Sequence, residues 1–124
     1  MSILGIGNDI IEIDRIESSI QRYGQKFLDR IFTLEEQNYC LKFQHSSRNF
    51  AGRFAAKEAV VKALGTGIRE GVSWLDIKIV NDVYGKPCVS FSEKLKKAFP
   101  GSEVLISISH SKEYATAVAI WKMD

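Results

Sequence analysis

The chain has 124 residues, of which 45% are hydrophobic and 26% are charged, and its formal net charge is +2. These values are typical of a globular protein, so we expect residues 1–124 to form a single domain. No apolar run approaches the ~20 residues that cross a bilayer, and so small a charge does not by itself indicate nucleic-acid binding. We therefore expect neither a membrane nor a nucleic acid as a partner.

The N-terminus and the two cysteines favour a cytoplasmic protein. The sequence MSILGIGNDIIEIDRI carries acidic residues and lacks the basic start of a signal peptide. Cys40 and Cys88 have neither the CxxC spacing of a zinc site nor the density of a disulfide framework. Two free thiols in a reducing compartment are the expected state.

The first predicted element is a short strand over residues 3–11, which are mostly apolar. Gly5 and Gly7 lie inside this strand, and glycine at such positions indicates a backbone that closely approaches a neighbour. A helix is predicted to follow, with Asp14 as its cap, and to end at about Tyr23, where a glycine comes next.

Two further helices are predicted in the first half of the chain. Thr33 and Glu36 have the spacing of a capping box and open a helix that reaches about Phe43. The next helix covers residues 50–64 and ends at the sequence GTG, which starts at Gly65.

The second half of the chain is mainly strand-like. Residues 76–91 contain two apolar runs around a glycine turn, which predicts a hairpin. Ser92 can cap a short helix over residues 93–99, and residues 103–121 contain two more strands. Helices first and antiparallel strands later indicate an α+β fold, with helices packed on a small antiparallel sheet.

Four charged side chains interrupt the apolar sequence FAGRFAAKEAVVK over residues 50–62: Arg53, Lys57, Glu58 and Lys62. On a helix, Arg53 lies about 40° from Lys57, and Glu58 lies about 40° from Lys62. A helix that is apolar nearly all round is usually buried, and a buried carboxylate needs a partner. One interpretation is a simple ion pair between Glu58 and Lys62. The other is a site in which the carboxylate holds a metal ion and the cations hold phosphates.

A metal site of this kind needs a second carboxylate, because Mg²⁺ typically takes one or two carboxylates together with waters and phosphate oxygens. Asp9 is the best candidate because it follows an apolar strand beside glycines, although it could equally be a cap, and Glu12 and Asp14 are alternatives. The GTG sequence at 65–67 is either an anion-binding nest or a helix stop. His110 either donates to a phosphate or merely ends a strand.

Three segments resemble the 4′-phosphopantetheinyl transferases, and within that family they are closest to the bacterial holo-acyl-carrier-protein synthases. The family's Gly-x-Asp motif matches Gly7 to Asp9, and its Phe-x-x-Lys-Glu-x-x-x-Lys motif matches residues 54–62. The terminal sequence ISISHSKEYATAVAI is similar to the family's last hairpin, with His110 at the matching histidine. The resemblance spans nearly the whole chain and implies a single 4′-phosphopantetheinyl transferase domain.

The resemblance implies an enzyme that moves the phosphopantetheine arm of coenzyme A to a serine of an apo acyl carrier protein for fatty acid biosynthesis. The second product would be adenosine 3′,5′-bisphosphate. Asp9 and Glu58 would hold Mg²⁺, and Glu58 and Lys62 would be catalytic, with Glu58 accepting the serine proton directly or through a water. Contacts with coenzyme A are implied for Arg53, Lys62, Gly65, Pro87 and His110.

The resemblance also implies partners. Acyl carrier proteins are acidic, and the family docks them on its first helix, which implies docking at Arg15, Arg22 and Lys26. Arg15 and Arg22 share one helix face, although a solvated basic face is the common alternative. Larger members of the superfamily carry two such folds with the site between them, whereas this chain has room for one. A homotrimer with sites at the subunit interfaces is therefore expected.

Two other functional classes remain as alternatives. A non-catalytic module that binds coenzyme A or a carrier protein is disfavoured by the joint presence of Asp9, Glu58 and Lys62. A nucleotide-sensing protein is disfavoured because the chain lacks the P-loop pattern GxxxxGK[ST].

Overall fold

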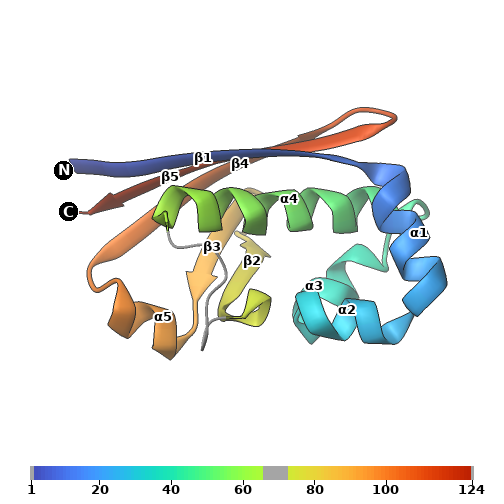
Figure 1. Ribbon diagram of the computed structural model, residues 1–124, viewed down its shortest axis with the longest axis horizontal. Coiled ribbons are helices and arrows are strands. Elements are labelled where there is room, and N and C mark those ends of the chain that lie inside the picture. Colours follow the sequence, from blue (N-terminus) through green and yellow to red (C-terminus); the bar gives the residue numbers. More distant parts are fainter. Residues whose placement is uncertain (1, 66–72, 124) are drawn as a thin grey trace.

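The computed structural model describes residues 2–65 and 73–123. Within these residues, β1 (Ser2–Glu12), β5 (Tyr114–Met123) and β4 (Ser102–His110) form an antiparallel sheet in the order β1-β5-β4. The long helix α4 (Ser46–Leu64) runs along one face of this sheet (Figure 1).

The remaining elements lie on the other side of α4 from the sheet (Figure 1). They are the hairpin of β2 (Ile77–Asn81) and β3 (Pro87–Phe91) and the short helices α1 (Ile13–Tyr23), α2 (Gln25–Ile31), α3 (Leu34–Cys40), η1 (Trp74–Asp76) and α5 (Glu93–Ala98). The predicted α+β fold, with helices packed on a small antiparallel sheet, is confirmed.

Small side chains allow α4 to lie close to the sheet. Ala115, Ala117 and Ala119 of β5 alternate toward the helix and are buried. Gly7 of β1 lies so close to α4 that an added Cβ would overlap the carbonyl oxygen of Ala59. The predicted close approach at the strand glycines is therefore confirmed, and it brings the side chains that follow Gly7 against α4.

We expect Gly7→Ala to destabilise the protein by roughly 1–3 kcal/mol, because backbone atoms of α4 occupy the space that the new methyl group needs. Urea unfolding measures this as a lower midpoint. Gly52→Ala is the matched control, because its Cβ would meet only the side chain of Ile108, at 3.1 Å, and alanine favours the helix. Equal midpoints for Gly7→Ala and the parent would contradict the prediction.

Several predicted helix ends are confirmed. Thr33 Oγ1 accepts from the Glu36 amide at 3.2 Å, and Glu36 Oε1 accepts from the Thr33 amide at 2.7 Å, which completes the capping box of α3. Ser92 caps α5 through the Leu95 amide. Gly65 ends α4 at φ 74°, in the left-handed region. The other glycine of the GTG sequence, Gly67, lies outside the described residues.

Three details of the helices differ from the predictions. Asp14 is not a cap, because β1 continues directly into α1 and Glu12 takes the N-cap position without a side-chain bond. Helix α4 begins at Ser46 rather than at Phe50. The prediction missed its first turn because that turn is polar and carries no apolar periodicity. Helix α2 was not predicted: Gly24 ends α1 as expected, but the chain immediately starts another helix.

No helix in the described residues is long and apolar enough to span a membrane. Cys40 and Cys88 are both free, as predicted. Burial raises the pKa of the Cys40 thiol to about 12.

Candidate active site

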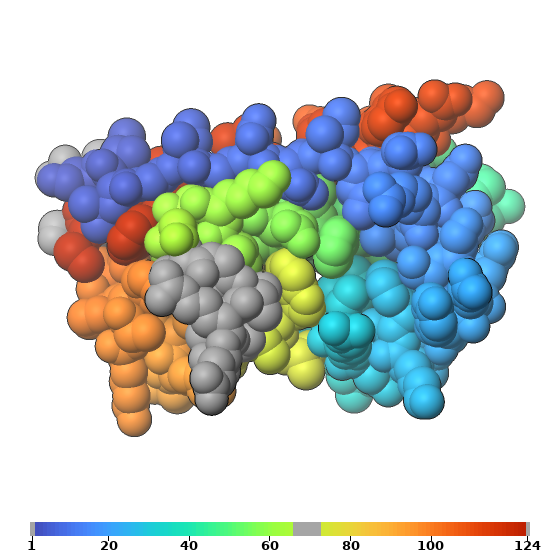
Figure 2. Space-filling model, viewed as in Figure 1, coloured from blue at the N-terminus to red at the C-terminus, as the bar shows by residue number. Residues whose placement is uncertain are grey.

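A cavity of about 510 Å³ opens between β1, α1 and α4. We call it the carboxylate cavity, because Asp9, Glu12 and Glu58 are among its lining residues. In Figure 2, part of α4 is visible at the surface directly below β1, and α1 lies on the same face of the molecule. The other lining residues are Ile10, Ile11, Arg15, Ile16, Ser19, Phe27, Phe54 and Tyr114.

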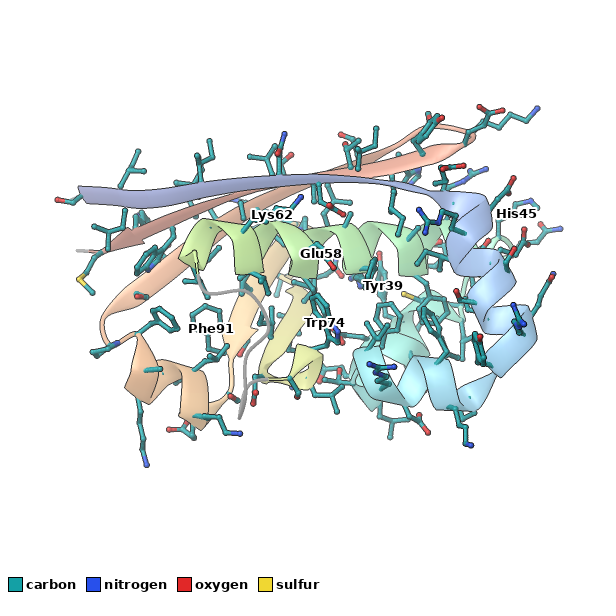
Figure 3. All side chains as sticks on the ribbon, viewed as in Figure 1. Tyr39, His45, Glu58, Lys62, Trp74 and Phe91 are labelled. Atoms are coloured by element: carbon teal, nitrogen blue, oxygen red, sulfur yellow. The ribbon has the colours of Figure 1, made fainter. Side chains whose placement is uncertain are left out.

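The strand and the helix position the two central carboxylates in a simple way. Alternate residues of β1 face α4, so Asp9, two residues after Gly7, lies beside the helix. Glu58 and Lys62 are one turn apart on the part of α4 next to β1 (Figure 3). Of these two central carboxylates, one therefore comes from the strand and one from the helix, and Glu12 at the end of β1 adds a third to the lining.

Within the described residues, Lys62 forms its ion pair with Asp9 of β1 and not with Glu58. Its Nζ lies 3.1 Å from Asp9 Oδ1 and 3.0 Å from the carbonyl oxygen of Asn8. The interpretation of Glu58 and Lys62 as a simple ion pair is therefore wrong, because the cation finds its partner on β1.

Glu58 is in an environment that disfavours its charge. Burial raises the pKa of its carboxyl, the negative charge of Asp9 raises it further, and Lys62 lowers it. Two neighbouring carboxylates of this kind accommodate a cation well, because the cation offsets both the burial and the repulsion.

The donor set of the carboxylate cavity fits Mg²⁺. The described residues contain no group of three or more histidine, cysteine and carboxylate side chains that could hold a metal ion. Two carboxylates match the habit of Mg²⁺, which keeps waters and takes phosphate oxygens from a substrate. Asp9 and Glu58 are the residues that would hold it.

Arg53 lies on a different side of α4 from Glu58, since five residues correspond to about 140° around a helix. It lines a second cavity, of about 290 Å³, together with residues of α3 and β2. Its guanidinium donates to Asn81 Oδ1 and lies 4.1 Å from the ring centroid of Tyr39. The two cavities share no lining residue, so the chain does not place Arg53 and Glu58 in one cavity.

The other residues predicted to contact coenzyme A also lie away from the carboxylate cavity. Gly65 follows the end of α4, and Pro87 opens β3 opposite Asn81. His110 is exposed at the end of β4. None of these three lines the carboxylate cavity.

Lys57 corrects the prediction that the cations of this helix face phosphates. Its side chain is fully buried, and its Nζ donates to Glu36 Oε1 at 2.7 Å and to the carbonyl oxygens of Ile31, at 2.7 Å, and Trp74, at 3.1 Å. Burial lowers the pKa of Lys57, while Glu36 opposes that shift. Sequence reasoning assigned Glu36 only to a helix cap and so missed the pair.

Only one of the three predicted docking residues lies at the carboxylate cavity. Arg15 lines it, whereas Arg22 and Lys26 are exposed on α1 and α2 outside the lining. Phe27 and Tyr114 line it as well and were missed. Phe27 lies on the helix that was not predicted, and Tyr114 carried no signal beyond membership of a strand.

The fold and the site together define an α+β protein with a paired-carboxylate site where a strand meets a helix. A family model described as "4'-phosphopantetheinyl transferase superfamily" matches residues 5–119. The chain belongs to this superfamily, and the resemblance of its motifs is confirmed.

Similar proteins give the same picture over nearly the full length. A holo-[acyl-carrier-protein] synthase of Protochlamydia amoebophila is 60% identical over 118 residues, which cover 95% of this chain and 97% of that protein. A crystal structure of a Bacillus anthracis holo-(acyl-carrier-protein) synthase in complex with CoA (3',5'-ADP) has a TM-score of 0.84 and 44% identity, covering 98% of both chains. The Helicobacter pylori synthase in complex with coenzyme A has a TM-score of 0.86 and 38% identity, covering 94% of this chain and 99% of that one.

Proposed function

We propose that this protein transfers the 4′-phosphopantetheine group of coenzyme A to a serine of apo acyl carrier protein in the cytoplasm, as a step that supports fatty acid biosynthesis. The products are holo acyl carrier protein and adenosine 3′,5′-bisphosphate. The observation that carries the proposal is the meeting of Asp9, Glu58 and Lys62 at one strand–helix contact. Relatives with 60% and 52% identity over nearly the whole chain are named holo-[acyl-carrier-protein] synthases.

Attack of a serine hydroxyl on a pyrophosphate builds negative charge on phosphoryl oxygens, so the site must supply positive charge and positioning. Asp9 and Glu58 hold Mg²⁺ in this proposal, and the ion when bound stabilises charge on those oxygens. Lys62 adds a second positive charge at the same place, because Asp9 and the Asn8 carbonyl hold its ammonium there.

The serine proton needs an acceptor within the cavity. Glu58 is the proposed acceptor, directly or through a water, because its carboxylate lines the cavity where the serine hydroxyl would enter. Phe54, one turn before Glu58 on α4, gives the cavity an apolar wall.

The residues proposed for the nucleotide end of coenzyme A lie elsewhere on the subunit. Arg53, Pro87 and His110 belong to the part of the molecule around β2, β3 and the end of β4, whereas Asp9 and Glu58 lie at the β1 edge. A coenzyme A molecule that contacts both groups is most simply bound between two subunits. Contact between unlike surfaces is a heterologous interface, which forms a ring when the rotation between subunits closes, and we propose a homotrimer of this kind.

The sheet offers a surface for such an assembly. The face turned away from α4 is uncovered in the described residues, and it carries Ile6 with 70% exposure and Ile10 with 64% (Figure 1). Strand register places Ile6 beside Ile120 and Ile120 beside Leu105, so an apolar row crosses the three strands. Exposed apolar patches of this kind mark protein–protein interfaces.

Ile6→Asp should convert the trimer to monomers and reduce transfer activity by at least ~10-fold, because it places a charge in the apolar row and separates the two halves of the site. Sedimentation velocity and the transfer assay measure the two effects. Leu34→Asp, at a position with 72% exposure on α3, is the matched control and should leave both unchanged. A fully active Ile6→Asp monomer would overturn the shared-site proposal.

Arg15→Glu should raise the KM for the acidic carrier protein by at least ~10-fold and leave coenzyme A binding unchanged, because Arg15 sits at the cavity mouth on α1. Steady-state kinetics with each substrate varied in turn separates the two. Lys97→Glu makes the same charge change on α5, at the other end of the molecule (Figure 1). An equal loss for both substrates would mean that Arg15 has a structural role.

The direct test of the proposed function is an intact-mass measurement. The protein is incubated with apo acyl carrier protein, coenzyme A and Mg²⁺, and the carrier should gain the mass of one phosphopantetheine group. Absence of the adduct, under conditions where a known synthase produces it, would overturn the proposal. Binding of coenzyme A without transfer would favour a non-catalytic module instead.

A further inference from the structure

Helix α4 is buried over most of its circumference. Between residues 50 and 64, only a narrow stripe of Phe54, Glu58 and Lys62 is not buried, and several of the buried side chains are alanine. An amphipathic helix is oriented by a wide polar face, whereas this stripe is narrow and its Lys62–Asp9 pair is partly exposed. Glu58 nevertheless has to face Asp9, and a slip of one residue would turn it by about 100°.

Lys57 supplies a directional anchor on the side of α4 opposite the sheet. Its ammonium uses all three of its N–H donors, on Glu36 and on the carbonyl oxygens of Ile31 and Trp74. These acceptors come from three separate segments, so the bonds are made together only at one rotation of the helix.

Glu36 extends this anchor to the hairpin. While Oε1 accepts from Lys57 and from the Thr33 amide, Oε2 accepts from the Ile79 amide of β2 at 2.7 Å. Both side chains are fully buried, and every bond lies between 2.7 and 3.1 Å. The pair therefore joins α4 to the ends of α2 and α3, to η1 and to β2.

Net stability is a poor explanation for a pair of this kind, because a buried ion pair often contributes no more than apolar side chains of similar volume. What distinguishes the Lys57–Glu36 pair from apolar side chains is that its hydrogen bonds are directional. We propose that Lys57 is a positioning residue, whose bonds fix the rotation of α4 and so hold Glu58 facing Asp9. Lys57 and Glu58 are adjacent in the chain, so fixing one side chain fixes the direction of the next. This role rests on the proposed Mg²⁺ and coenzyme A site.

The double variant Glu36→Gln/Lys57→Met separates positioning from stability, because it removes both charges and keeps similar volumes. Its matched control is Glu93→Gln/Lys96→Met, which removes an exposed pair 3.5 Å apart on α5 that lines neither the carboxylate cavity nor the Arg53 cavity. The measurements are urea unfolding, calorimetric binding of coenzyme A with and without Mg²⁺, and steady-state kinetics.

The double variant should unfold cooperatively, as the parent does. We expect the factor by which Mg²⁺ lowers the Kd for coenzyme A to be at least ~10-fold smaller in the double variant than in the parent. We also expect the kcat of the double variant to fall at least ~100-fold, a loss of about 2.7 kcal/mol in transition-state stabilisation. The KM for carrier protein should stay within about 2-fold, since α1 is not altered, and the control should match the parent throughout.

Two results would overturn the positioning role. One is a folded double variant with the parent's Mg²⁺-dependent binding and kcat. The other is failure of the double variant to fold, since the pair would then be needed for the core as a whole. If the parent itself shows no Mg²⁺-dependent binding of coenzyme A, the proposed function fails instead, and the two failures are distinct.

Discussion

Lys57→Met should destabilise the protein by about 3–5 kcal/mol, one of the largest effects that a single substitution can have here. Methionine fills a similar volume but leaves the Glu36 carboxylate buried without its cation. It also removes the donor from the carbonyl oxygens of Ile31 and Trp74. Removing one partner of a buried ion pair costs far more than replacing both partners, because the remaining charge is neither paired nor hydrated.

Urea unfolding measures this loss as a lower midpoint with an unchanged slope. Lys78→Met is the control, because it breaks the exposed pair with Glu35 and should cost no more than about 1 kcal/mol. A Lys57→Met midpoint within the error of the parent would show that the network relaxes without its cation. The double substitution with Glu36→Gln should recover part of the loss, which a double-mutant cycle quantifies.

The predictable parts of the fold are those set by local chemistry. Thr33 and Glu36 cap α3 because the capping box depends only on residues three apart. The glycine turn of the β2–β3 hairpin and the alternation of β4 are local in the same sense. Helix α2 was missed because it has only seven residues and follows directly on the glycine that ends α1. The first turn of α4 was missed because its sequence is polar.

The functional site also contains parts that local sequence predicts and parts that depend on tertiary packing. Asp9 and Glu58 could be paired from the sequence because each is an acid within an apolar stretch, and a buried acid needs a partner. Glu36 could not be paired with Lys57, since 21 residues separate them and the contact exists only after α3 packs against α4. Arg53 was grouped with Glu58 on one helix, but position along a helix does not tell which side a residue faces until the neighbouring layers are known.

Glu58→Gln should reduce transfer activity by roughly 100-fold or more while the protein remains folded. The proposed Mg²⁺ site loses one of its two carboxylates, and several kcal/mol of charge stabilisation in the transition state depend on that ion. Gln keeps the shape of the side chain, so coenzyme A contacts around Arg53 and His110 should survive. Activity measured against Mg²⁺ concentration should show that saturation is lost or moved to much higher concentration.

The same substitution should slightly stabilise the metal-free protein at neutral pH. The pKa of Glu58 is raised in the folded protein, so its ionised form is less favourable there than in the unfolded chain. This penalty is absent below the ordinary glutamate pKa, appears as the pH rises from that value through the raised pKa, and is complete above it. The gain in stability from Glu58→Gln should therefore vanish at acidic pH, which unfolding curves at several pH values would reveal.

Asp14→Asn, which changes an exposed carboxylate on α1, is the control for both activity and stability. A Glu58→Gln protein with parental turnover would remove Glu58 from the metal site, and one with reduced stability at neutral pH would mean that the carboxylate has a structural partner.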